Sequence, residues 1–353
     1  MITVGVDAHK RMHVALALDE AGLELGQWRG INSAAGWHSL ARWAEELGPT
    51  RQWAIEGAWN YGRGLAQHLV ARGETVFEVN ARWTALGRRS ARKPGKTDKL
   101  DARAVALLAR QEAETLPRVL KEDTSAILAL LTTEREAAIG EATRVGNQIH
   151  ALLLQLDPEY HGRLANIRSR SGLATLESYA TSDGSLIQQE RAAAVRRLAV
   201  RLRLLLSQAE ELAERIEAYA RTRFSPLTRL CGVNLLTAGM LAGILGPGSR
   251  FSTDAEMAAY AGAAPLEASS AGVTRHRLNR GGNRRLNAIL FRIVLTQAHY
   301  SPAAKAYLQR RMSEGKTRRE AVRALKRYII RAIWRLWQDC QAMPAESAAE
   351  HAA

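Results

Sequence analysis

Apolar residues in the first 80 positions form short runs that alternate with segments of helical spacing. The apolar, β-branched runs predict strands at residues 2–7, 12–18, about 23–28, 52–56 and 75–79. Apolar positions three and four apart predict helices at residues 34–47 and 61–72. The resulting order, β-β-β-α-β-α-β, predicts an α/β domain at the N-terminus.

This order matches a ribonuclease-H-like sheet, although order alone leaves other α/β folds open. Residues 88–96 are basic, contain Pro94-Gly95, and are interpreted as a flexible lead-in to the next element. A further helix is expected from Thr97, whose hydroxyl suits an N-cap, to about Glu112. We therefore predict a first domain over residues 1–115.

Two long segments in the middle of the chain keep apolar residues three and four apart without a break. The repeated positions are Leu128, Leu131, Arg135, Ala138, Ala142, Val145, Ile149 and Leu152, then Val195, Leu198, Leu202, Leu205, Ala209, Leu212, Ile216 and Tyr219. Such a seam predicts a coiled coil or a long helical hairpin over residues 120–225, with a small insertion at 158–184. An internally packed bundle fits it about as well as an intermolecular coil. Because three heptads stay in phase, we favour oligomerisation.

From Pro226 onward, short helices are joined by glycines. Residues 230–241 resemble a helix-hairpin-helix, in which a glycine turn directs backbone N–H groups at a phosphate. Asn234 stands where a second glycine is common in such a hairpin. Further helices are expected at 284–299, 303–312 and 317–340, which predicts an all-α domain over residues 226–340. The Ala/Glu-rich residues 341–353 are expected to form a disordered tail.

Charge indicates a polyanionic partner. The 353 residues carry a net charge of +15, and the sequence pI is about 10.4. From Ala271 to Cys340 there are seventeen Lys/Arg and three acids; from Arg82 to Arg110 there are nine and two. Few aromatic residues lie among the C-terminal arginines, so phosphate contact is favoured over base stacking there. A basic ribosomal or solubility surface is the alternative.

Composition disfavours a membrane or secreted protein. There is no run of about 18 apolar residues, so no membrane span is expected. The segment Met1–Asp7 lacks the regions of a signal peptide and is interpreted as a first strand. The two cysteines, Cys231 and Cys340, provide neither a disulfide framework nor clustered metal ligands. A reducing cytoplasm fits this cysteine content best.

Four carboxylates form a candidate metal site. Asp7 and Glu56 each end a predicted strand, whereas Asp98 and Asp101 share one face of a first helical turn. Oxygen ligands alone suit Mg²⁺ or Mn²⁺, and two such ions activate phosphodiesters. The alternative is a turn aspartate together with ordinary acidic capping of a helix start. His9 is a candidate for contact with the scissile phosphate.

A second candidate lies far downstream. Ser269 and Ser270 stand in the segment 262–272 and are followed by an arginine-rich stretch. A serine hydroxyl can attack phosphorus when metals or arginines stabilise the developing charge. By composition alone, two serines before glycine are more often a flexible turn.

Several motifs together resemble one protein family. They are Val4-Gly5-Val6-Asp7-Ala8-His9-Lys10, Glu56, Lys96-Thr97-Asp98-Lys99-Leu100-Asp101-Ala102 and the block 265–286. This combination is similar to the bacterial insertion-sequence transposases of the DEDD type, which are related to the Piv and MooV DNA invertases. The likeness covers most of residues 2–300, with a coiled-coil spacer between the halves.

The resemblance implies a RuvC-like N-terminal domain and a C-terminal transposase domain with a nucleophilic serine. Asp7, Glu56, Asp98 and Asp101 would be the metal ligands. The family has a serine pair directly before glycine, whereas Ala271 intervenes here; the nucleophile therefore stays open, with Ser270 favoured over Ser269. Residues expected to contact nucleic acid are Lys10, Lys96, Lys99, Arg103, Arg275, Arg277, Arg280, Asn283, Arg284 and Arg285.

The resemblance also implies partners: double-stranded donor and target DNA, a guide (bridge) RNA, and further copies in a homodimer or homotetramer. The expected function is excision and insertion of an insertion-sequence element by metal-assisted serine attack on DNA. Three alternatives remain. They are a junction-resolving nuclease that uses water, an actin-like kinase or ATPase, and a non-catalytic nucleic-acid-binding remnant.

Overall fold

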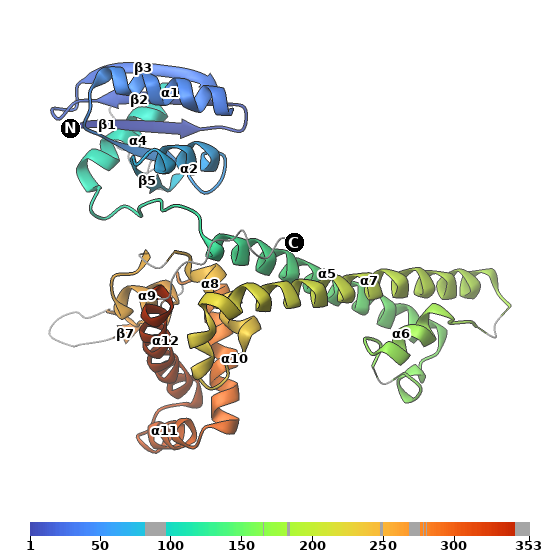
Figure 1. Ribbon diagram of the computed structural model, residues 1–353. Helices are drawn as coiled ribbons and strands as arrows, with labels where there is room; N and C mark the ends of the chain where they lie inside the picture. Colours follow the sequence, from blue (N-terminus) through green and yellow to red (C-terminus); the bar gives the residue numbers. More distant parts are fainter. Residues whose placement is uncertain are drawn as a thin grey trace. The chain divides into compact units, whose positions relative to one another are not determined.

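The computed structural model divides the chain into two compact units, Met1–Asp123 and Thr124–Ala353 (Figure 1). Each unit has its own hydrophobic core. The structure describes residues 1–81, 97–164, 166–181, 184–247, 250–267, 276–277, 279 and 281–342.

A five-stranded mixed sheet forms the centre of the N-terminal unit. Its strands are β1 (Ile2–Ala8), β2 (Met12–Leu18), β3 (Glu24–Ile31), β4 (Arg51–Glu56) and β5 (Thr75–Val79). The strand order is β3-β2-β1-β4-β5; β1, β2 and β3 form an antiparallel meander, and β4 and β5 run parallel to β1. The predicted order of strands and helices along the chain and the predicted three-strand meander are confirmed, and the sheet is consistent with a RuvC-like domain.

Helices cover both faces of this sheet, so its central strands are buried along almost their whole length. Val4, Val6 and Ala8 of β1 pack in the core formed with α1 (Ala34–Leu47) and α2 (Arg63–Ala71). Leu16 of β2 packs in the other core, with the small residues of α4 (Asp98–Glu112). The helix predicted from Thr97 to about Glu112 is thereby confirmed.

Helix α4 and strand β1 approach each other very closely at Gly5. A Cβ atom on Gly5 would lie 2.3 Å from the backbone oxygen of Ala102 and 2.4 Å from the backbone nitrogen of Ala106. Only glycine fits at such a backbone-to-backbone contact. Gly5 therefore fixes the distance between β1, which carries Asp7, and the helix that carries Asp98 and Asp101.

The middle of the chain is a helical hairpin. Helix α5 (Thr124–Leu156) packs along α7 (Leu186–Arg223), and the predicted insertion contains η1 (Tyr160–Gly162) and α6 (Arg170–Glu177) (Figure 1). Seam residues are buried within one chain: Leu128, Leu131, Ala142, Val145 and Ile149 on α5, and Val195, Leu202, Leu205, Leu212 and Ile216 on α7. These apolar positions therefore support internal packing, not the intermolecular contact that we favoured, and oligomerisation stays a prediction.

The rest of the second unit is mostly helical. Its elements are η2 (Ser225–Arg229), α8 (Leu235–Leu245), α9 (Asp254–Tyr260), β6 (Leu266–Glu267), β7 (His276–Arg277), α10 (Arg284–Tyr300), α11 (Pro302–Ser313) and α12 (Arg318–Ala342). The two-stranded ladder of β6 and β7 departs from the predicted all-α domain, which is mostly helical instead, and α9 is a helix that was not predicted. Helix α8 packs against both α5 and α7, so the predicted middle and C-terminal regions share one unit. The division at residue 225 stays a prediction.

Two further observations complete the fold. No helix among the described residues has the length and apolar character needed to cross a lipid bilayer. The predicted tail, residues 341–353, lies outside the described residues from position 343 onward.

Candidate metal centre

Two of the predicted acids stand side by side at the ends of parallel strands. Asp7 of β1 and Glu56 of β4 are directly paired in the register of the two strands. Gly57 follows with φ +73°, a left-handed conformation that ends β4 directly after the carboxylate. The fold thus places both residues at the C-terminal ends of two neighbouring inner strands.

The other two acids come from the first turn of α4. Thr97 caps this helix, with its hydroxyl accepting a hydrogen bond from the Leu100 backbone N–H at 3.3 Å. Asp98 is half-exposed and Asp101 is buried. The capping interpretation is correct for Thr97, but it does not account for Asp101, because an acid that only favours the helix dipole has no need of burial.

Electrostatics shows that the four acids form one cluster. The pKa of Asp7 is raised from 3.8 to about 6, chiefly because burial disfavours the charged carboxylate. The charge of His9 opposes this shift, while the charges of Glu56, Asp101 and Asp98 each raise the pKa further. All three acids are therefore close enough to act on Asp7.

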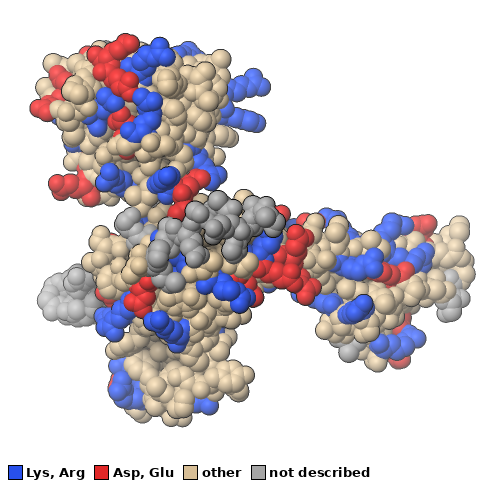
Figure 2. Space-filling view, in the orientation of Figure 1, with Lys and Arg blue, Asp and Glu red and all other residues tan. Residues whose placement is uncertain are grey.

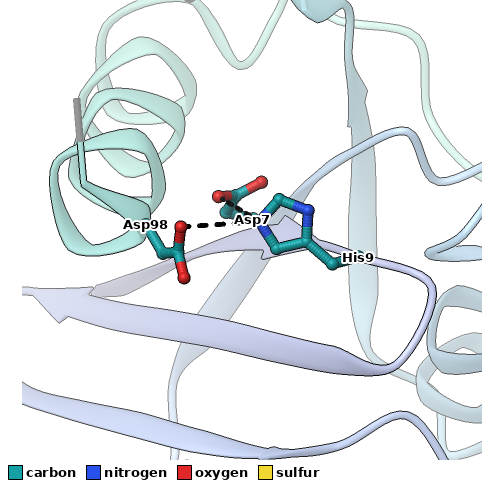
Figure 3. Close-up of side chains that lie close together, drawn as sticks. All are labelled: Asp7, His9 and Asp98. Carbon is teal, nitrogen blue, oxygen red and sulfur yellow. Dashed lines mark ion pairs between the residues drawn. The ribbon is translucent and has the colours of Figure 1, made fainter.

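His9 lies among these carboxylates (Figure 3). Its Nε2 atom is 3.1 Å from the Oδ2 atom of Asp7 and 3.7 Å from the Oδ1 atom of Asp98. Ligand atoms of the three residues lie within 4.8 Å of one another. The sequence interpretation used oxygen ligands alone and reserved His9 for the phosphate; the structure instead brings His9 to the acids. A neutral imidazole is itself a metal ligand.

The residues present fit a divalent cation. The Oδ2 atom of Asp7 is buried and accepts no hydrogen bond from a described residue, although it lies near His9. A buried carboxylate oxygen in that state is unfavourable unless a cation balances it. The carboxylates provide oxygen ligands, and a neutral imidazole would add one nitrogen ligand.

Glu78 of β5 is a residue that sequence reasoning missed. Burial raises its pKa to about 7, although hydrogen bonds to the backbone of Ala58 and Trp59 oppose the shift and the charge of Glu56 adds to it. Glu78 therefore holds the turn that follows Glu56. No sequence signal identifies it, because only the pairing of β4 with β5 brings it to this turn.

The raised pKa of Asp7 predicts how metal binding depends on pH. Below about pH 6 a proton occupies Asp7 and competes with the cation, so affinity should fall about fivefold from pH 6 to pH 5. Above about pH 7 affinity should level off. Titration of Mn²⁺ followed by electron paramagnetic resonance at pH 5, 6, 7 and 8 measures this; equal affinity at pH 5 and pH 7 would contradict it.

The serine candidates stand between two paired strands. Leu266 pairs with Arg277, and Glu267 pairs with His276, so residues 268–275 connect β6 to β7. Ser269, Ser270, Arg275 and Arg280 lie outside the described residues, as does the side chain of Arg277. The role of the serines stays a prediction.

Basic residues of the N-terminal unit have mixed surroundings. Lys99 pairs with Glu24 at 2.7 Å, and Arg103 lies 4.0 Å from the same carboxylate. Lys10 is exposed, and Lys96 lies outside the described residues. Exposed ion pairs of this kind are weak, so Lys99 and Arg103 remain available to phosphates.

Candidates around the start of α10 have local partners. Asn283 caps the helix through the Leu286 backbone N–H at 3.0 Å, and its amide donates to the Tyr260 hydroxyl at 2.8 Å. Arg285 pairs with Glu136 of α5 at 2.8 Å. Arg284 is exposed. Asn283 and Arg285 thus have structural contacts, and their predicted contact with nucleic acid stays untested.

The predicted helix-hairpin-helix contains a different arrangement. Asn234 caps α8 through the Thr237 backbone N–H, and Gly232 has φ +89°. Together with Arg135 and Arg292 this turn lines a cavity of about 500 Å³. The charge of Arg292 adds to burial in lowering the pKa of Arg135. Two like charges beside a helix N-terminus suit an anion, and the sequence interpretation had assigned Arg135 only to the helical seam.

Comparison with known proteins places both halves of the chain. A transposase family model of the DEDD type matches residues 4–158, and the Transposase IS116/IS110/IS902 family matches residues 225–309. The first region contains all four acids, and the second contains the serine pair. The chain belongs to the IS110/IS116 family of transposases.

Three similar proteins come from insertion elements of Streptomyces and Mycobacterium species. The chain is 29% identical to a 43.6 kDa protein of element IS110 from Streptomyces coelicolor, over 69% of this chain and 71% of that protein. It is 25% identical to a 44.8 kDa protein of element IS116 from Streptomyces clavuligerus, over 96% and 95%. It is 24% identical to a 42 kDa protein of element IS900 from Mycobacterium paratuberculosis, over 96% of each chain.

Proposed function

We propose that this transposase-family protein cuts and rejoins DNA to excise and insert an insertion-sequence element, with a serine as the nucleophile. The observation that carries the proposal is the convergence of Asp7, Glu56, Asp98 and Asp101 in a chain that both family models match. These acids, with His9, would hold Mg²⁺ or Mn²⁺. When bound, the cations would stabilise charge on the reacting phosphodiester.

The proposed reaction conserves the energy of the DNA linkage. The Oγ atom of Ser270 attacks phosphorus, a P–O bond of the DNA breaks, and the leaving oxygen departs as a hydroxyl on one DNA end. After strand exchange, a DNA hydroxyl attacks the phosphoserine and releases the serine. The acids and the serine would act on the same phosphate, whether one subunit or two supply them.

The proposal extends to partners. A guide RNA and a homodimer or homotetramer rest on the family resemblance, and a nucleoid-associated location in bacterial cytoplasm follows from the DNA substrate. The basic residues from Arg275 to Arg285 would neutralise DNA phosphates. Treatment of the purified protein with ribonuclease should abolish recombination if RNA guides it, and light scattering measures the number of subunits.

Replacing both serines with alanine separates the candidate functions. The substrate is a labelled duplex that carries the ends of the element, and the readouts are strand cleavage and a protein–DNA adduct that survives denaturation. For a serine recombinase we expect wild type to give both and the Ser269→Ala/Ser270→Ala variant to give neither. A junction-resolving nuclease, which needs only the acids, would still cleave and would never form an adduct.

Two further comparisons complete this test. Ser270→Ala alone should remove the adduct while Ser269→Ala retains it, which assigns the nucleophile. A wild-type protein that binds the duplex and never cleaves it with either metal would contradict the proposal and indicate a non-catalytic remnant.

A further inference from the structure

A large cavity opens on the C-terminal unit. It has a volume of about 990 Å³ and lies among α10, α11, α12 and the segment Gly262–Pro265. This volume is at the upper end for sites that hold small molecules or single nucleotide units, roughly 300–1,000 Å³. In Figure 2 basic side chains stand out over the region of α11 and α12.

Its walls are strongly basic. Helix α12 contributes Arg323, Lys326, Arg327 and Arg331, while Arg284 comes from α10 and two further arginines from α11. The acids beside these seven cations are Asp254, Glu314 and Glu320. Seven cations against three acids leave an excess of four positive charges among the described residues, which favours an anionic occupant.

The cations differ in how they are held. Asp254 pairs with Arg327 at 2.7 Å and with Arg331 at 3.1 Å. Lys326 donates to the side-chain oxygen of Asn287 at 2.7 Å. Within the described part of the chain, Arg284 and Arg323 have no ion pair with an acid. These two guanidinium groups are therefore the ones available to a phosphate.

Aromatic rings stand beside these charges. Tyr328 is 54% exposed and meets Tyr307 edge to face, with ring centroids 5.2 Å apart. Phe291 is 44% exposed and lies 5.1 Å from the Lys326 ammonium. Exposed rings among cations are typical of surfaces on which unpaired bases stack. The sequence interpretation disfavoured stacking here because few aromatic residues lie among the C-terminal arginines.

The cavity adjoins the segment with the serine candidates. Gly262–Pro265 lines it and leads directly into β6, and β6 leads into residues 268–275. The close fit of Gly262 against Gly282, where an added Cβ would lie 3.3 Å from the Gly282 Cα, ties this lining to the start of α10. A ligand in the cavity would therefore lie beside the segment that leads into β6, the strand that precedes the serine pair in the sequence.

We propose that the cavity holds an unstacked nucleotide of single-stranded DNA, with its phosphates on Arg284 and Arg323 and its base against Tyr328. A duplex keeps its bases stacked and would leave the rings unused. The link between this cavity and cleavage rests on the proposed function. In that function the bound nucleotide would flank the cleaved phosphodiester and hold that strand in place. The binding itself does not depend on catalysis.

The test measures binding of a fluorescent ten-nucleotide oligothymidine to the full chain, with EDTA present so that no metal contributes. We expect Arg284→Ala/Arg323→Ala to weaken binding at least tenfold. The slope of log affinity against log salt should also become shallower by about 1.4, because each phosphate contact on a single strand contributes about 0.7. Tyr328→Leu should weaken binding about tenfold, while Tyr328→Phe, which keeps the ring, should not.

Controls separate this cavity from general charge. Arg335 is exposed on the same helix and does not line the cavity, so Arg335→Ala should change affinity less than twofold. Equal losses for Arg335→Ala and Arg323→Ala would overturn the proposal. So would tighter binding of a duplex or of oligouridine than of oligothymidine.

Failure of this proposal can be told apart from failure of the proposed function. If DNA is never cleaved while Tyr328→Leu still weakens oligonucleotide binding, the cavity remains a single-strand site. If wild type cleaves DNA and the cavity variants bind the oligonucleotide as wild type does, the single-strand site is rejected and the proposed function is not.

Discussion

Replacing Asp7 with asparagine should reduce strand cleavage by a factor on the order of 10³ or more and, at the same time, stabilise the metal-free protein. The loss follows because Asp7 is a buried acid of the proposed metal site, and its charge interacts with those of the other three acids. The gain follows because the folded state keeps a charged carboxylate away from water and beside three other acids. Asparagine has the same shape and no charge.

The stability difference should depend on pH in a defined direction. Asp7 has a folded pKa of about 6 and an ordinary value of 3.8, so its charge opposes folding fully above pH 6 and not at all below about pH 3.8. At pH 8 we expect Asp7→Asn to raise the free energy of unfolding by about 1–3 kcal/mol. At pH 4 most of the gain should be lost. Urea unfolding in EDTA at both values measures it.

Asp98→Asn is the matched control, because its side chain is 50% exposed and belongs to the same cluster. It should lose activity as well but change stability much less. With saturating Mn²⁺, wild type should have a higher free energy of unfolding than Asp7→Asn, because only the intact site is stabilised by metal binding. An Asp7→Asn variant that unfolds more easily than wild type at pH 8 would show that burial of this charge is not the dominant effect.

The N-terminal sheet could be predicted because its signals are local. The strands at 12–18 and 75–79 and the helix at 34–47 coincide with β2, β5 and α1. The four acids were found for the same reason, since they follow strand ends and a capped helix start. Convergence then required that β1 and β4 be parallel neighbours and that α4 pack against β1 at Gly5.

Features that depend on distant partners were missed or misinterpreted. His9 joins the acids through a turn whose geometry no pattern encodes, and Glu78 reaches the turn after Glu56 only through strand pairing. Arg285 has the same sequence context as Arg284, yet α5 supplies Glu136 to Arg285. The apolar repeat of α5 and α7 is the same whether the helices pack within one chain or against another copy. A heptad pattern specifies that a helix has a packing partner, but not which chain provides it.

Replacing Gly5 with alanine should destabilise the N-terminal unit and disrupt the metal site together. The new Cβ would meet two backbone atoms of α4 at 2.3 and 2.4 Å, and backbone cannot turn aside as a flexible side chain can. Overpacking costs about 1–3 kcal/mol, and we expect the upper end of that range. The strain is relieved when α4 moves away from β1, which carries Asp98 and Asp101 away from Asp7 and Glu56.

Urea unfolding of the full chain and Mn²⁺ titration below the transition measure the two effects of Gly5→Ala. The two units can unfold in separate transitions. In Gly5→Ala the transition that moves to lower urea concentration should be the same one that Mn²⁺ moves to higher urea concentration in wild type. Gly140→Ala is the control: its Cβ would meet only the Arg144 side chain, at 3.8 Å, and alanine favours the helix by up to about 1 kcal/mol. Wild-type stability with unchanged Mn²⁺ affinity in Gly5→Ala would mean that the contact between β1 and α4 does not set the spacing of the four acids.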